Sequence, residues 1–275
     1  ELLAQGKLGA EALSLRSWDT LNLTREELRQ IRHWAEGMRL DIHNSTVPAL
    51  CQACEARHGG ICGALEPTQL QQLGRQTARR EVPPGTQLIA AGVPADGYAN
   101  ILSGVVKLIK LMPDGRQQIV GLQFAPDFLG RPFAESSDVG AEAASTVRLC
   151  TFSRSALEQM VRQAPALEHR LHRQALRELD DARDWMMTLG QKSASEKVAS
   201  FLLLLAAHVD PLTGGYSATF DIVLRRADIA DFLGLTIETV SRSLSRLRRD
   251  GTITIERSRT VTILDIDALE AAAGR

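Results

Sequence analysis

Residues from about Glu81 to Ser153 alternate short apolar runs with turn-forming residues. Runs such as Val105–Leu111 and Gln118–Phe124 recur roughly every 8 to 12 residues. The breaks between the runs are rich in Pro, Gly and Asp: Pro83-Pro84-Gly85, Gly92-Val93-Pro94, Pro113-Asp114-Gly115 and Ala125-Pro126-Asp127. Short strands with frequent turns are typical of antiparallel sandwiches and barrels. We therefore predict an all-β domain of sensor size in this segment.

From Ser155 to about Gln191 the apolar spacing becomes helical. A heptad pattern places one set of residues along one seam of this helix: His172, Ala175, Leu179, Ala182, Met186 and Leu189. Such a seam is able to pair two copies of the helix. The alternative is a helix that packs on its own barrel, with Leu171, Trp185 and Met187 making the contact.

The last third of the chain has the pattern of a winged helix-turn-helix. An amphipathic helix over 195–208 is followed by a helix over 226–233, a turn at Gly234-Leu235, and a second helix from Ile237 to about Asp250. Thr236 is a good cap for that second helix, and Gly251 is suited to end it. Two alternating strands, 252–256 and 260–264, joined by Arg257-Ser258-Arg259, predict the wing.

The second helix of this unit has one apolar and one polar face. Its apolar positions recur at helical spacing and are expected to face the core: Ile237, Val240, Leu244 and Leu247. Outward positions include Glu238, Ser241 and Arg242 near the helix start. A carboxylate there accepts from cytosine and an Arg binds guanine, so Glu238 and Arg242 are candidate base readers.

Positive charge accumulates around this helix. Residues 225–260 contain eight Arg and five acids, an excess of 3 in a chain of net charge -1. Candidate phosphate contacts, which position rather than specify, are Thr239, Arg246, Arg248 and Arg257. The alternative is an ordinary solvated helix whose Glu238–Arg242 pair contributes about 0.2–0.5 kcal/mol.

Composition limits the remaining possibilities. The chain has 275 residues, 44% of them apolar and 24% charged, enough for two ordinary folded domains. Its longest apolar run, Phe201–Ala207, is far shorter than the roughly 20 residues of a membrane span, and Glu1-Leu2-Leu3-Ala4 does not open a secretory signal. We expect a cytoplasmic protein without a membrane partner. The absence of a Gly-rich phosphate loop, a nucleophile elbow and an H-E-x-x-H helix argues against an enzyme.

Three of the four cysteines lie within twelve residues, in the sequence Cys51-Gln52-Ala53-Cys54 followed by Cys62; the fourth is Cys150. The glycines at 59, 60 and 63 suit a tight ligand loop, in which His58 is expected to be a surface residue. A C-x2-C pair chelates one centre, and zinc and iron-sulfur clusters share thiolate chemistry. The lack of a second C-x2-C pair favours a cluster over zinc. The same spacing is compatible with a thiol-disulfide switch and with four unrelated thiols.

The combination resembles the FNR branch of the FNR/cAMP receptor protein superfamily, in its FnrL/FnrN-like form, over about residues 48–268. The most specific stretches are 51–65 and 233–242. The resemblance implies an α+β fold with a cyclic-nucleotide-binding-like β-roll (jelly roll), a long dimerisation helix and a C-terminal winged helix-turn-helix. It also implies a [4Fe-4S] cluster on Cys51, Cys54, Cys62 and Cys150, and base reading by Glu238, Ser241 and Arg242.

The same resemblance implies an oxygen-sensing activator. It would bind the cluster under low oxygen, form a homodimer, bind a TTGAT-N4-ATCAA-like site in double-stranded DNA and contact RNA polymerase. The dimerisation residues would be Leu179, Ala182, Met186 and Leu189. Ala182 stands where the family prototype has an acidic residue that opposes dimerisation; Asp180, Asp181 and Asp184 are nearby substitutes.

The chain is expected to divide into five segments: an N-terminal extension of unknown role (1–47), a Cys-rich loop (48–65), a β-roll (66–160), a dimerisation helix (161–191) and a DNA-binding domain (192–275). In the extension, Thr24 and Glu27 form a capping box that predicts a helix to about Leu40. Cyclic nucleotide is not expected. Phe128-Leu129-Gly130-Arg131-Pro132 has Arg where related domains have the ribose-binding Glu, and Gly140–Ala144 lacks the phosphate-binding Arg.

Overall fold

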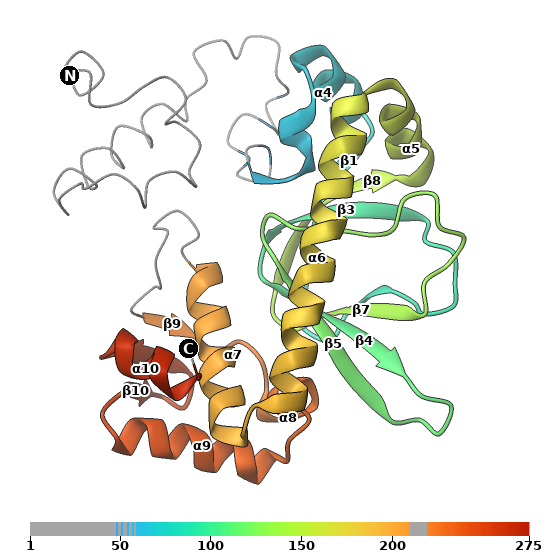
Figure 1. The fold of residues 1–275 in the computed structure, drawn as a ribbon. Helices are drawn as coiled ribbons and strands as arrows, with labels where there is room; N and C mark the ends of the chain where they lie inside the picture. The colour runs from blue at the N-terminus through green and yellow to red at the C-terminus, as the bar shows by residue number, and fades with distance from the viewer. Residues whose placement is uncertain are drawn as a thin grey trace, which may run out of the picture.

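The computed structural model describes residues 59–209 and 219–274, together with Pro48, Cys51, Cys54 and Arg57. The predicted helix from Thr24 to Leu40 and the position of His58 lie outside the described residues. Figure 1 shows a β-roll beside a long helix that runs down to a smaller helical unit. Among the described helices, none has both the length and the apolar composition that crossing a bilayer requires.

The predicted all-β domain is confirmed as two four-stranded sheets whose pairings are all antiparallel. The first sheet has the order β1 (Thr77–Val82), β8 (Val147–Ser153), β3 (Gly97–Ser103) and β6 (Phe128–Leu129). The second has the order β2 (Gln87–Ile89), β7 (Val139–Ala143), β4 (Val105–Leu111) and β5 (Gln117–Phe124). Ile101, Val106 and Leu149 are buried between the sheets. The first strand begins at Thr77, a few residues before the predicted start.

Short helices cover one end of the roll. They are η4 (Ile61–Ala64), α4 (Pro67–Gly74) and α5 (Arg154–Gln163). Pro67 stands at the first turn of α4, where its missing N–H costs nothing, and Gln69 accepts from the Glu66 amide. Ile61, Leu157 and Leu167 have no exposed surface and join these helices to the first turns of α6 (Pro165–Gln191) in one core.

The helical stretch predicted as continuous from Ser155 is two helices. Ser153 caps α5 by accepting from the Ala156 amide, and α5 ends at Gln163. Ala164 has φ -127° and ψ 88°, and Pro165 begins α6. Proline disfavours the helical conformation in the residue before it, so the break falls at Ala164 and the long helix starts at Pro165.

Helix α6 runs along the roll and reaches the C-terminal unit (Figure 1). Its middle section is exposed: Leu176 is 60% and Met186 72% accessible. The Trp185 ring lies tilted against the Phe232 ring with centroids 4.5 Å apart, and Trp185 packs on the core that the roll and the C-terminal unit share. The interpretation of Met187 as a barrel contact is wrong, because 52% of its surface is exposed.

The C-terminal unit has the predicted order of elements. Helix α7 (Ala194–Val209) and strand β9 (Thr219–Asp221) precede α8 (Arg226–Leu233) and α9 (Ile237–Arg249). The wing is β10 (Ile253–Glu256) and β11 (Thr260–Ile263), and β9 extends it to a three-stranded sheet in the order β10-β11-β9. Helix α10 (Ile266–Ala272) packs on α7 and closes the unit.

The β-roll and the C-terminal unit share one hydrophobic core. Val105, Ile119 and Phe124 of the roll are buried in the same cluster as Phe201 of α7 and Phe232 of α8. Apolar surface removed from water stabilises this contact by roughly 25 cal/mol per Å². The two parts are therefore held together by burial, not only by the connecting chain.

Replacing Phe232 by Ala is expected to destabilise the protein by about 3–5 kcal/mol, since Phe232 is 2% exposed and its loss opens a cavity between α6, α7 and α8. Urea unfolding followed by circular dichroism measures this change. Phe133→Ala is the matched control, because Phe133 is 51% exposed. Equal losses in both variants would contradict the shared core.

Candidate functional site

The recognition candidate, α9, begins where the local chemistry favours it. Gly234 takes a left-handed conformation (φ 61°) that ends α8 and turns the chain. Thr236 then accepts a hydrogen bond from the Thr239 amide at 3.2 Å. This side chain satisfies one of the N–H groups that a helix start leaves unpaired. Gly251 follows α9 at φ 76°, as predicted for its end.

Helix α9 is amphipathic, with Val240, Leu244 and Leu247 buried as predicted. The prediction that Ile237 faces the core is wrong, because it is 46% exposed. Ile237 is the first residue of α9, next to the exposed cap Thr236, and lies beyond the end of the buried stripe. Ser243 is buried instead, at 6% exposure. Its small side chain allows α9 to pack closely there.

The candidate base readers lie together on the exposed face of the first turns of α9. Glu238, Ser241 and Arg242 are all exposed. Hydrogen bonds from its own backbone amide and from Thr236 hold the pKa of Glu238 below its usual range, and Arg242 acts in the same direction. Glu238 is therefore an ionised acceptor at neutral pH. Arg242 donates to the Thr239 hydroxyl at 3.3 Å, and the face combines acceptor and donor groups.

The candidate phosphate contacts flank this face. Arg246 lies 3.6 Å from Asp250, in an exposed ion pair, and Arg248 is exposed beside it. Arg257 is at the wing turn, where Arg257 and Ser258 have φ of 49° and 59°. Exposed ion pairs contribute little, so Arg246 is able to leave Asp250 for a phosphate at small cost.

A second site lies at the opposite end of the β-roll. All four cysteines line one small cavity, together with Arg79, Asn100 and residues of α4. Cys62 comes from η4 and Cys150 from the middle of β8, while Cys51 and Cys54 come from the segment before η4. The fold thus joins Cys150 to three cysteines that are distant from it in sequence. All four are free thiols.

Strand pairing places Asn100 and Cys150 side by side, since they are register partners between β3 and β8. The Asn100 side chain donates to the Cys62 sulfur at 3.2 Å. Asn100 is only 1% exposed, and its Oδ1 lacks a partner among the described residues. Burying the Asn100 amide costs free energy unless the amide is hydrogen-bonded. Its N–H is directed at the Cys62 sulfur, and this hydrogen bond is most favourable when the sulfur carries negative charge.

Burial and mutual proximity raise the pKa of three of the thiols, those of Cys51, Cys62 and Cys150. Burial first, then the neighbouring cysteines, raise the pKa of Cys62 to about 12 and that of Cys150 to about 11. Burial and Cys54 also raise the pKa of Cys51, while Arg57 and Arg79 lower it. Without a metal these thiols stay protonated at neutral pH, so binding of a metal centre must release protons.

The sulfur donors fit a soft metal centre, because an all-thiolate set is the chemistry of zinc and of iron-sulfur clusters. Within the described residues, however, no three His, Cys, Asp or Glu side chains form a group arranged to hold a metal ion. A tetrahedral zinc site needs sulfurs about 2.3 Å from one ion. The cavity is therefore surrounded by the right donors, but they do not converge as the ligands of a single ion.

Known protein families match both parts of the chain. The Crp-like helix-turn-helix domain family matches residues 196–272, and the Cyclic nucleotide-binding domain family matches residues 79–164. A "Probable transcriptional activator" of Rhizobium leguminosarum bv. viciae is 53% identical over 84% of this chain and 96% of its own length. The chain belongs to the CRP/FNR family of transcription regulators. As a member of this family it is a transcriptional activator whose helix-turn-helix binds DNA.

Two further similarities support the assignment of this regulator to the CRP/FNR family. The "Transcriptional activator protein FnrL" of Cereibacter sphaeroides is 38% identical over 83% of this chain and 94% of its own length. The solved structure of FixK2 from Bradyrhizobium japonicum has a TM-score of 0.65 and 28% identity, covering 71% of this chain and 96% of that one. The expected β-roll with a C-terminal helix-turn-helix is confirmed.

Sequence reasoning did not identify Asn100 or Leu176. Asn100 had a visible signal, since it is a polar residue inside the apolar run Tyr98–Leu102. Leu176 falls outside the chosen heptad, and its exposure only becomes apparent when the neighbours of α6 are known.

Replacing Thr236 by Ala is expected to lower the free energy of unfolding by about 1 kcal/mol, because the Thr239 amide loses its cap. Thr236→Ser keeps the hydroxyl and is expected to stay close to the parent protein. Thermal unfolding of the two variants makes the comparison. Equal destabilisation by Ser and Ala would show that the hydroxyl is not the stabilising group.

Proposed function

We propose that this activator is an oxygen sensor that holds a [4Fe-4S] cluster on Cys51, Cys54, Cys62 and Cys150. The observation that carries the proposal is that four cysteines, three of them within residues 51–62 and the fourth on β8, line one cavity beside a buried amide that donates to sulfur. When bound, such a cluster supplies a redox centre that oxygen degrades. The side chains supply four thiolates, and Asn100 stabilises the charge on Cys62.

The cysteine segment contacts the dimerisation helix directly. Ile61 and Cys62 pack in the same core as Leu167 of α6, and Arg170 donates to the Gly59 carbonyl at 2.6 Å. A cluster bound by Cys51, Cys54 and Cys150 would tether the cysteine segment to β8 and so order the chain that contacts the first turns of α6. Such ordering favours one placement of the helix over others.

The proposed dimer forms along the exposed part of α6. Leu179 is 45% and Met186 72% exposed, Ala182 is exposed, and Leu189 is half-buried. Burial of this apolar strip in a partner helix stabilises the dimer. Asp180, Asp181 and Asp184 lie beside the strip and oppose association through like-charge repulsion. This balance allows a small change at the cysteine site to shift the equilibrium between monomer and dimer.

Dimerisation creates the proposed DNA specificity. Each α9 reads one half-site through Glu238, Ser241 and Arg242, and two-fold symmetry places the pair about 34 Å apart on a palindrome. The proposed operator is TTGAT-N4-ATCAA-like, with activation through contact with RNA polymerase. A monomer, with one recognition helix, binds weakly.

We do not assign a cyclic nucleotide to the β-roll. Gly130 and Arg131 line a cavity of about 650 Å³, but Arg replaces the carboxylate that would bind ribose hydroxyls. In the segment Gly140–Ala144, where related domains have a phosphate-binding Arg, Glu142 faces Lys107 with an N–O distance of 2.8 Å. That segment supplies no Arg for a cyclic phosphate.

Protein purified without oxygen is expected to be brown, with four iron and four sulfide per chain as the proposed cluster formula requires. Admission of air is expected to bleach the visible absorption band. Cys150→Ala is expected to lack both the band and the iron, because one of four ligands is lost. Asp114→Ala, an exposed change at the β4–β5 turn, is the control and is expected to keep the colour.

Two different results would refute the cluster, and each points to another chemistry. A colourless protein that holds zinc and is indifferent to air would be a zinc-containing regulator. A protein without metal whose DNA binding responds to peroxide and recovers with reductant would contain a thiol-disulfide switch.

Replacing Arg242 by Ala is expected to weaken binding to the cognate site by about 1–3 kcal/mol, with little effect on nonspecific DNA, because a base contact is lost. Fluorescence anisotropy with matched and base-substituted duplexes measures both. Arg248→Ala is the comparison and is expected to weaken all duplexes alike. The same uniform loss with Arg242→Ala would make Arg242 a phosphate contact.

A further inference from the structure

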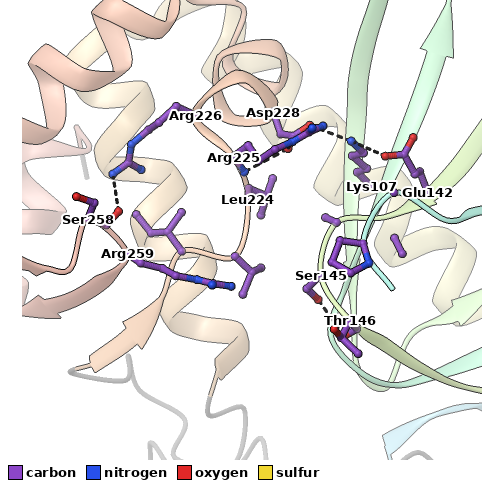
Figure 2. Close-up of a pocket in the computed structure, with 16 residues that line it drawn as sticks. Lys107, Glu142, Ser145, Thr146, Leu224, Arg225, Arg226, Asp228, Ser258 and Arg259 are labelled. Atoms are coloured by element: carbon purple, nitrogen blue, oxygen red, sulfur yellow. Dashed lines mark hydrogen bonds and ion pairs between the residues drawn. The ribbon is translucent and has the colours of Figure 1, made fainter. Parts of the chain in front are cut away.

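A buried lysine joins the β-roll to the DNA-binding unit. Lys107 of β4 is 3% exposed, and its ammonium lies 2.8 Å from Glu142 of β7 and 2.9 Å from Asp228 of α8. Figure 2 shows Lys107 reaching from the roll towards Asp228, with Glu142 on its other side. Strand register explains one pair, since Lys107 and Glu142 are partners between β4 and β7. The other pair crosses between the two parts of the molecule.

The burial of Lys107 favours the docked arrangement of the DNA-binding unit over other arrangements. A lysine is almost never this buried unless it is paired, because its charge loses the solvation of water. Removing Asp228 from its place would leave Lys107 with Glu142 alone, whose side chain is 29% exposed. The arrangement with the DNA-binding unit docked is thus the one in which the buried charge is fully paired.

Asp228 also organises the start of α8. Its Oδ2 accepts from the Arg225 amide at 3.2 Å and from the Arg225 side chain at 3.0 Å. Its Oδ1 accepts from Lys107. One carboxylate therefore fixes the first turn of the helix-turn-helix and attaches that turn to a strand of the roll.

A second attachment lies one turn further along α8. Gln117 of β5 donates to the Asp231 carboxylate at 2.9 Å, and Gln118 donates to the Asp231 carbonyl oxygen. Two attachments on one helix restrict its rotation as well as its position. Buried residues of α8 and α9 pack in the same hydrophobic cluster, on either side of the Gly234 turn. The orientation of α9 therefore follows that of α8.

The contact is charged over the neutral range. Burial disfavours ionised Asp228, but hydrogen bonds from Arg225 and Lys107 outweigh it and hold the pKa of Asp228 below its usual range. Burial likewise disfavours charged Lys107, but Glu142 and Asp228 outweigh it and raise the pKa of Lys107. The stabilisation is lost only in acid, as Asp228 takes up a proton, or in strong alkali, as Lys107 loses one.

We propose that Lys107 is a positioning residue for DNA recognition: through Asp228 it fixes the DNA-binding unit on the roll and so sets the separation of the two recognition helices. This inference rests on the proposed dimer on a two-half-site operator. Without the Lys107 contact, each unit stays attached through the shared hydrophobic core and the Asp231 contacts but takes a wider range of orientations. The preference for one spacing between half-sites should then weaken, while reading of a single half-site is retained.

The test uses full-length protein purified without oxygen and duplexes in which TTGAT and ATCAA are separated by the four-base-pair spacer, by one pair fewer, or by one or two pairs more. A duplex with one half-site completes the set. For Lys107→Met, affinity for the four-base-pair spacer is expected to fall about tenfold, a usual coupling magnitude. Affinity for the other duplexes is expected to change less than about twofold, so the spacing preference flattens.

Three variants make the result specific. Lys110→Met removes a positive charge from the same strand at an exposed position and is expected to keep the spacing preference. Asp228→Asn keeps an oxygen to accept from the Arg225 amide but loses the charge, and is expected to behave like Lys107→Met. The double variant is expected to be no worse than either single one, because both changes break the same contact.

The outcomes separate the two proposals. If the parent protein has no spacing preference, the paired half-site function is wrong. If the parent has the preference and Lys107→Met and Asp228→Asn keep it, the positioning role is wrong. A uniform loss on every duplex, including the single half-site, would also overturn the inference, because it indicates only structural damage.

Discussion

The position of α8 on the sheet of the β-roll that contains β4 and β5 is the constraint on which the rest of the structure depends. Phe232 of α8 is buried between Trp185 of α6 and Phe201 of α7, and the same cluster includes Ile119 of the roll. Burial supplies most of the attraction but is not directional. The Lys107–Asp228 pair adds direction, since a buried charge tolerates few arrangements. Apolar contact therefore holds the two parts together, and the ion pair selects how they meet.

This arrangement gives the regulator two sites at opposite ends of one helix. The first turns of α6 pack against the cysteine segment through Leu167, and its last turns pack against α8 through Trp185. The same helix is exposed where it carries Leu179 and Met186. A helix anchored at both ends and open in the middle is suited to couple cysteine chemistry, dimerisation and DNA recognition, the three parts of the proposed function.

Local pattern explains which elements the sequence made predictable. Turn residues between short apolar runs predicted the β-roll, and Gly234 and Thr236 predicted the turn and cap of the helix-turn-helix, because those conformations depend on neighbouring residues alone. Pro165 carried a local signal for the break at Ala164 too, but the helical spacing that begins at Ser155 was extended across it. Ile237 followed the helical period and is nevertheless exposed, since periodicity does not tell where the neighbouring core ends.

The sequence by itself determined the all-β segment, the winged helix-turn-helix and the identity of the four cysteines, because these depend on spacing and residue chemistry. Only the tertiary structure decided that Cys150 lies beside Asn100, and that Asn100 donates to Cys62, since strand register joins residues far apart in the chain. It also decided the partner of Lys107. In the sequence that lysine is one charge within the apolar run Val105–Leu111, and its pairing with Asp228 arises only when α8 docks on the sheet. No local pattern in the sequence reveals pairing between residues that are this far apart in the chain.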